Sequence, residues 1–253
     1  MAAKSKAPGY NKNGRILWQG ISPIDGSPLV CIITGLTQTS GNAKTGGMLQ
    51  TWILRTDVRP DHAYQTGDDY AICGNCPHRK FNNLPDGTLQ PAQGSCYVRK
   101  YQAPLSVWEC FRRGGYAPAT GYEFAAGRTV RFGSYGDPAM VPAEVWQGLA
   151  TAADSHTGYS HQWRQPWAQQ LKGLVQASCD GMADYIDATA HGWKTFLVKA
   201  AGSPDPAGMA HCAASAERGA KTDCATCRLC NGATANVVID AHGAMAGRVT
   251  VTA

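Results

Sequence analysis

The sequence predicts an α/β protein that forms either a partial parallel (βα) barrel or an open parallel sheet, with an N-terminal hairpin and cysteine-rich loops. Strand-like and helix-like segments alternate from residue 129 onward, which is typical of parallel strands joined by crossover helices. A complete eight-unit barrel needs about 250 residues. The chain has 253, and many of them lie in hairpin and cysteine-bearing loops. We therefore expect an incomplete barrel or an open sheet.

The composition indicates a folded, soluble chain. Hydrophobic residues make up 43% of it, only 16% of residues are charged, and the mean hydropathy is −0.28. No apolar run approaches the about 20 residues that span a bilayer, so we expect no membrane segment. The basic N-terminus lacks the apolar core of a secretory signal, so we expect a cytoplasmic protein. In that reducing compartment, clustered cysteines more often bind metal than form disulfides.

The first half of the chain reads as a short arm, a hairpin and loops. We expect a flexible basic arm at residues 1–14. We expect residues 15–253 to form a single α/β domain with cysteine-rich segments at 73–96 and 212–230. Strands are expected at 15–20 and 29–36, joined by the turn signal Asp25-Gly26. Residues 38–47 form a Gly-rich polar loop, and residues 51–55 a strand or short helix. A helix is expected at 103–114.

The second half has a regular pattern. Strands are predicted at 129–132, 158–163, 175–178, 193–199 and 237–240, and helical segments at 142–153, 165–171 and 182–190. We expect the first four of these strands to be parallel neighbours with helices on the outside.

Seven of the ten cysteines fall into two groups. Cys73 and Cys76 form a CxxC, which Cys96 follows after a turn-rich stretch able to fold back on itself. Cys224, Cys227 and Cys230 form a CxxCxxC with Cys212 upstream. Three thiolates at that spacing are typical of iron–sulfur proteins, and thiolates two residues apart can also bind zinc. The alternative for each group is buried structural thiols. His78 and His242 are further possible ligands.

Polar groups follow three consecutive strands of the predicted sheet. The first strand ends in Gly133, Ser134, Tyr135, Gly136 and Asp137, the second carries His161, and the third ends near Asp180. Ligands of parallel α/β folds lie at the carboxyl ends of the strands. We therefore expect a site there, with Asp137, His161 and Asp180 as catalytic candidates. Asp137 and Asp180 could instead cap the helices that follow them.

Two segments resemble a known family. RTVRFGSYGDPAMVPAEVW is similar to the strand–Gly-Gly-Glu-Pro–helix segment of radical S-adenosylmethionine (SAM) enzymes, and VQASCDGMADYIDATAHGWKTFLV to a later strand of that family. The family's cluster loop is CxxxCxxC, whereas 19 residues separate Cys76 from Cys96 here. More loosely, the chain resembles cysteine-rich phage proteins of unassigned function.

The resemblance implies a radical-SAM-like enzyme. Cys73, Cys76 and Cys96 would then hold a [4Fe–4S] cluster with one iron open for SAM. Residues Gly133, Ser134, Tyr135, Gly136 and Asp137 would hold SAM, and His161 or Asp180 would contact substrate or ribose. Cys212, Cys224, Cys227 and Cys230 would hold an auxiliary cluster.

Two alternatives from other classes stay open. One is a zinc-containing, nucleobase-exchanging enzyme resembling guanine transglycosylases, with Asp137 or Asp180 as nucleophile. The other is a non-enzymatic, zinc-stabilised nucleic-acid-binding protein. A DNA or RNA partner is suggested by basic and aromatic residues around the first cysteine group, namely Arg79, Lys80, Tyr97, Arg99, Lys100, Tyr101, Trp108, Arg112 and Arg113. The Gly-rich loop lacks a full phosphate-loop pattern, so nucleotide hydrolysis is not expected.

Overall fold

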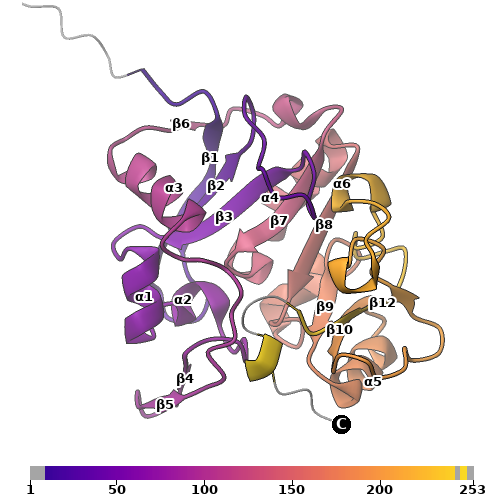
Figure 1. Cartoon of the computed structure of the whole chain (residues 1–253). Coiled ribbons are helices and arrows are strands. Elements are labelled where there is room, and N and C mark those ends of the chain that lie inside the picture. The colour runs from indigo at the N-terminus through magenta and orange to yellow at the C-terminus, as the bar shows by residue number, and fades with distance from the viewer. Residues whose placement is uncertain (1–8, 243–245, 250–253) are drawn as a thin grey trace, which may run out of the picture.

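The computed structural model describes residues 9–242 and 246–249, and its main feature is one large open sheet (Figure 1). Ten strands lie in the order β11-β12-β10-β9-β8-β7-β3-β2-β1-β6. Their bounds are β1 (Gly14–Ile21), β2 (Pro28–Thr34), β3 (Leu49–Arg55), β6 (Ala117–Pro118), β7 (Thr129–Tyr135), β8 (Ser155–Ser160), β9 (Gln176–Cys179), β10 (Thr195–Lys199), β11 (Ala210–His211) and β12 (Val237–Asp240). The sheet does not close into a barrel, so the expected open parallel sheet is confirmed.

Short helices and turns connect the strands. The helices are α1 (Pro60–Thr66), α2 (Tyr70–Cys73), α3 (Ala103–Arg112), α4 (Ala143–Ala152), α5 (Met182–Ala190) and α6 (Cys224–Cys227), and the 3₁₀ turns are η1 (Glu123–Ala125), η2 (Pro138–Met140), η3 (Pro166–Leu171), η4 (Ala216–Arg218) and η5 (Ala246–Arg248). A separate small hairpin pairs β4 (Phe81–Asn83) with β5 (Leu89–Pro91). Within the described ranges, we find no helix that is both long and apolar enough to cross a membrane.

The N-terminal hairpin is present, and residues 51–55 are a strand. β1, β2 and β3 pair antiparallel, and the Asp25 carboxylate accepts a hydrogen bond from the Ser27 amide (3.0 Å) in the turn between β1 and β2. Residues 29–33 of β2 are almost fully buried, which explains their unbroken apolar run. β3 then pairs parallel with β7 and joins the hairpin to the rest of the sheet.

The parallel run is the part of the fold that positions the site. β7, β8, β9 and β10 are parallel neighbours, as predicted, so their carboxyl ends meet at one edge. Helix α4 covers one face of this sheet. Its Trp146 ring lies 4.8 Å from the Phe132 ring of β7, and both side chains are fully buried in the main core.

The opposite face carries a second, smaller apolar cluster. Tyr159 of β8 and Phe196 of β10 pack there with ring centroids 4.5 Å apart, against Cys212 and Cys230. The C-terminal cysteines, two of which lie on α6, therefore cover the face that α4 leaves open.

Residues 1–8 of the predicted basic arm lie outside the described residues. From residue 11 onward, the chain is hydrogen-bonded to the rest of the domain. The Asn13 side chain accepts hydrogen bonds from the amides of Thr37 and Gln38, at 2.9 and 2.8 Å.

Candidate metal centres

The loop that carries Cys73 and Cys76 rests on the carboxyl end of β8. Cys73 is the last residue of α2, and Gly74 follows it with a φ of +53°. A Cβ at Gly74 would lie 2.4 Å from the Gln162 side-chain oxygen, so only glycine allows this approach. The Gln162 side-chain nitrogen donates to the Cys73 carbonyl (3.1 Å). No sequence pattern points to a role for Gly74.

Arg79 holds this cysteine loop in shape from inside. Its guanidinium is buried and donates to the Asp69 carboxylate at 2.7 and 2.9 Å. It also donates to the carbonyls of Gly67 (2.7 Å) and Gly74 (3.3 Å). One side chain thereby ties both ends of α2 to the residues that follow Cys76.

The fold-back between Cys76 and Cys96 is present. Hairpin β4–β5 takes up most of the intervening residues, and the returning chain pairs with residues 78–80. The Cys96 amide donates to the His78 carbonyl, and the Gly94 amide to the Arg79 carbonyl, both at 2.9 Å. This backbone pairing places Cys96 next to the loop that carries Cys73 and Cys76.

The three thiols are close enough to influence one another. Burial raises the pKa of the Cys73 thiol well above its ordinary value, and neighbouring Asp69, Cys76 and Cys96 raise it further. Burial also raises the pKa of Cys96, while Lys100 lowers it in part. We call Cys73, Cys76 and Cys96 the first cysteine centre.

Tyr135 closes the inner side of the first cysteine centre. It is 3% exposed, and its hydroxyl has no hydrogen-bond partner among the residues that the structure describes. Burial raises its pKa well above the ordinary value, and Cys73, Asp69 and Cys96 add to that shift. A buried, unsatisfied hydroxyl next to thiols is costly unless an acceptor is bound there.

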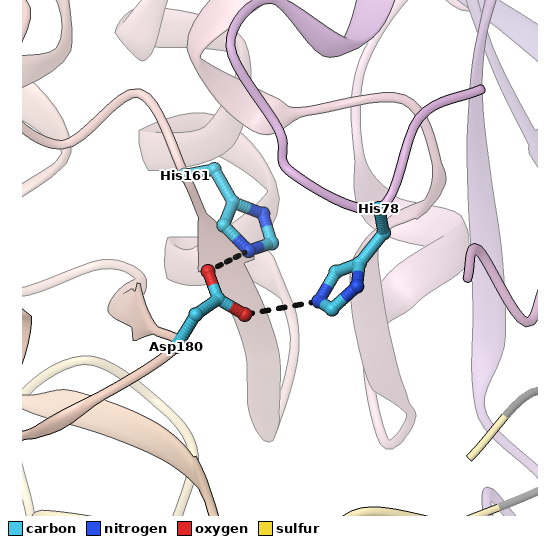
Figure 2. A group of neighbouring side chains, drawn as sticks. All are labelled: His78, His161 and Asp180. Atoms are coloured by element: carbon cyan, nitrogen blue, oxygen red, sulfur yellow. Dashed lines mark ion pairs between the residues drawn. The ribbon is translucent and has the colours of Figure 1, made fainter. Parts of the chain in front are cut away.

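His78, Asp180 and His161 form a compact polar group beside this centre (Figure 2). The Nε2 atom of His78 lies 3.0 Å from Oδ1 of Asp180, and that of His161 lies 3.2 Å from Oδ2. Burial raises the Asp180 pKa, but His161 and His78 outweigh it and leave this pKa well below the usual range. Burial lowers the His161 pKa, but Cys76 and Asp180 outweigh it and leave this pKa well above the usual range. The convergence of His161 and Asp180 predicted from the strand ends is present, and His78 joins them from the cysteine loop.

The Asp137 carboxylate is buried and hydrogen-bonded to neighbouring protein groups. Its carboxylate accepts hydrogen bonds from Ser160 Oγ (2.7 Å) and from the amides of His161 (2.8 Å) and Ala139 (2.9 Å). The Ala139 bond is the helix-capping role considered as an alternative, here at η2. Asp137 therefore fixes the position of His161, and its direct contact with a cofactor or substrate stays a prediction.

Gly133 and Gly136, at the end of β7, lie directly against other protein atoms. A Cβ at Gly133 would lie 2.6 Å from the Gly136 carbonyl, and one at Gly136 would lie 2.6 Å from Cβ of Ile53. Both have positive φ. The turn through Ser134 and Tyr135 is thus tightly packed against β3.

Cys212, Cys224, Cys227 and Cys230 form a second cysteine centre. They line one cavity on the face opposite α4, together with Tyr159 and Phe196. Cys224 and Cys227 lie one turn apart on α6, whose first turn is capped by the Asp223 carboxylate through the Thr226 amide (2.8 Å).

Electrostatics couple the four thiols of the second centre. Burial raises the pKa of Cys230 to about 12, a hydrogen bond from Tyr159 lowers it in part, and the other three thiols raise it. Burial also raises the pKa values of Cys212 and Cys224.

Cationic residues border the second centre. Lys44 lowers the pKa of both Cys212 and Cys224, and its Nζ lies 2.9 Å from Nε2 of His242. Arg131 of β7 also lowers the Cys224 pKa, and within the described ranges its buried Nε has no hydrogen-bond partner. Neither Lys44 nor Arg131 was expected at a cysteine site.

The Gly-rich loop serves the second centre. The Lys44 carbonyl accepts a hydrogen bond from the Cys224 amide (2.9 Å), and a Cβ at Gly46 would lie 2.6 Å from the Asp223 carboxylate. The glycines thus allow close approach to α6.

Two basic residues of the suggested nucleic-acid surface are buried. Arg79 is paired with Asp69, and the Lys100 ammonium lies 3.6 Å from the centre of the Tyr64 ring. They stabilise the cysteine loop, and a DNA or RNA partner stays a prediction that depends on the other basic residues.

Comparisons with family models, with curated proteins and with solved structures gave no match.

Proposed function

We propose that the protein is an iron–sulfur enzyme of radical-SAM-like type, in which Cys73, Cys76 and Cys96 ligate a [4Fe–4S] cluster. One observation carries the proposal. Although 22 residues lie between Cys73 and Cys96, the chain folds back so that the Cys96 amide donates to the His78 carbonyl (2.9 Å), and Cys76 and Cys96 lie near enough to Cys73 to raise its pKa, beside His161 and Asp180 at the carboxyl edge of a parallel sheet. That edge is where α/β enzymes bind their ligands.

The residues present fit an iron–sulfur cluster in three respects. The donors are thiols, which clusters require. The unpaired Tyr135 hydroxyl, next to Cys73 and Cys96, could donate to a cluster sulfur. Such hydrogen bonds tune cluster potential. Finally, three cysteines leave one iron without a protein ligand.

A cluster also accommodates a wider arrangement of thiolates than one zinc ion does. Four sulfurs with Zn–S bonds of about 2.3 Å lie about 3.8 Å from one another. Among the described residues, only His78, His161 and Asp180 bring three ligand atoms within 4.8 Å of one another. The cysteine centres are therefore more open than one zinc requires. A cluster spreads its thiolates over several irons.

When bound, such a cluster would supply the electron for reductive cleavage of SAM. The chain's own residues then have separate tasks. Arg79 shapes the ligand loop, the Tyr135 hydroxyl would donate a hydrogen bond to a bound cluster from its inner side, and Asp137 positions His161. His161 and Asp180 contact the substrate, which we propose to be a nucleic acid or a nucleotide-derived molecule. The second cysteine centre holds an auxiliary cluster, with Arg131 and Lys44 offsetting its negative charge.

The guanine-transglycosylase-like alternative is less well supported. It needs Asp137 or Asp180 as a free nucleophile. Asp137 is buried and already accepts three hydrogen bonds, and Asp180 lies between two histidines.

The test is iron and sulfide content after anaerobic reconstitution. Wild type should be brown and hold two cluster equivalents. Combined alanine substitution of Cys73, Cys76 and Cys96 should remove one equivalent, and that of Cys224, Cys227 and Cys230 the other. Cys110→Ala, a half-buried thiol outside both centres, should remove none. A colourless wild type with stoichiometric zinc would overturn the proposal.

A further inference from the structure

We propose that His78, His161 and Asp180 bind one divalent transition-metal ion of the zinc or iron(II) type. The site uses none of the seven grouped cysteines. The inference therefore goes beyond the proposed cluster chemistry and can be tested apart from it.

The three side chains already have the spacing of ligands around one ion. The His78 and His161 Nε2 atoms lie 3.0 and 3.2 Å from the two Asp180 oxygens, and one ligand atom from each residue lies within 4.8 Å of the others. Ligand atoms bound tetrahedrally at about 2.0–2.1 Å are about 3.3 Å apart. Small side-chain rotations would suffice to admit the ion.

Each ligand is held in place by a neighbour. Nδ1 of His78 is hydrogen-bonded to Ser95 Oγ (2.7 Å), the kind of outer contact that orients metal-binding histidines. The His161 amide donates to the Asp137 carboxylate (2.8 Å), and the Asp180 amide to the Asp184 carboxylate (3.1 Å). The group is thus oriented by three further side chains, those of Ser95, Asp137 and Asp184.

The donor set indicates the class of ion. Two imidazoles and one carboxylate are typical of catalytic zinc sites and of non-haem iron(II) sites. Three protein ligands leave coordination positions for water or substrate. The His78, His161 and Asp180 side chains are 16, 20 and 14% exposed, so an ion can reach them from solvent.

A metal here would give His161 and Asp180 a means of contacting substrate. The ion would bind an oxygen or nitrogen of a substrate placed beside the first cysteine centre, because His78 lies on the same loop as Cys76 and its carbonyl accepts the Cys96 amide (2.9 Å). The ion would then act as a Lewis acid, held by two catalytic candidates of the sequence analysis, His161 and Asp180, and by its possible ligand His78.

The experiment counts zinc on protein already reconstituted with iron and sulfide. Wild type should bind one zinc per chain beyond its iron. Asp180→Asn and His78→Gln should each weaken this binding by more than about 100-fold, and Ser95→Ala by about 10–100-fold. Iron and sulfide should stay at the wild-type level in all three. Asp187→Asn is the matched control, since Asp187 pairs with His191 at an exposed site.

The outcomes separate this inference from the cluster proposal. Equal zinc in wild type, Asp180→Asn and His78→Gln would overturn the metal site, whatever the iron content. If the cysteines take zinc instead of iron, that background is common to all variants, and the loss in Asp180→Asn still supports the site. Circular dichroism checks that the variants are folded. If Asp180→Asn does not fold, the zinc content of His78→Gln is the test of the metal site.

Discussion

Replacing Arg79 with alanine should both destabilise the protein and empty the first cysteine centre. Arg79 and Asp69 are each 2% exposed, and the guanidinium also bonds to the carbonyls of Gly67 and Gly74. Removing one partner of a buried ion pair costs about 3–5 kcal/mol, because the other charge stays buried without compensation. In a chain of this size, that loss corresponds to a fall in Tm of about 6–20 °C.

Two measurements check the Arg79 prediction. Urea denaturation should show the loss of stability, and iron content after reconstitution should fall by one cluster equivalent. Arg59→Ala removes the exposed pair with Asp61 and should change neither value. A stability loss below about 1 kcal/mol in Arg79→Ala, the size typical of a surface pair, would refute the argument that this buried pair organises the loop.

Two further predictions concern the strand end and a buried histidine. Gly136→Ala should lower the free energy of unfolding by about 1–2 kcal/mol because of its positive φ, and by about 1–3 kcal/mol more because of the contact with Ile53. Gly26→Ala, which is also at positive φ but in open space, should show only the first of these losses in denaturant unfolding. Equal losses in the two variants would contradict the packing argument. Burial lowers the pKa of His156 below its ordinary value of about 6.5, so the unfolded chain takes up a proton first as pH falls. Stability should therefore drop as pH falls below about 6.5, by at most about 1.4 kcal/mol per pH unit from this group. His156→Gln should flatten that part of the stability–pH curve, and an unchanged slope would refute the assignment.

The strands of the fold could be predicted because their signals are local. The apolar run of β2, the Asp25-Gly26 turn and the alternation after residue 129 each depend on neighbouring residues and are confirmed, although the strand predicted at 158–163 lies at Ser155–Ser160. The convergence of His161 and Asp180 could also be predicted, since it follows from parallel neighbours sharing one edge.

The remaining site features depend on long-range contacts that no local pattern records. Arg79 reads as a surface cation in sequence, and only the fold-back of the β4–β5 hairpin shows it buried beside Asp69. Gly46 and Lys44 suggest a phosphate loop, yet they pack on α6, 180 positions along the chain (224 − 44). His78 does carry a local signal, because it lies two residues after Cys76.

The most direct test of the central claim is electron paramagnetic resonance of the reduced, reconstituted protein with Cys224, Cys227 and Cys230 replaced by alanine. Only the first cysteine centre can then give a signal. We expect the spectrum of a reduced [4Fe–4S] cluster that changes when SAM is added, because Cys73, Cys76 and Cys96 leave one iron open. The absence of a cluster signal, or a signal that SAM leaves unchanged, would contradict the account.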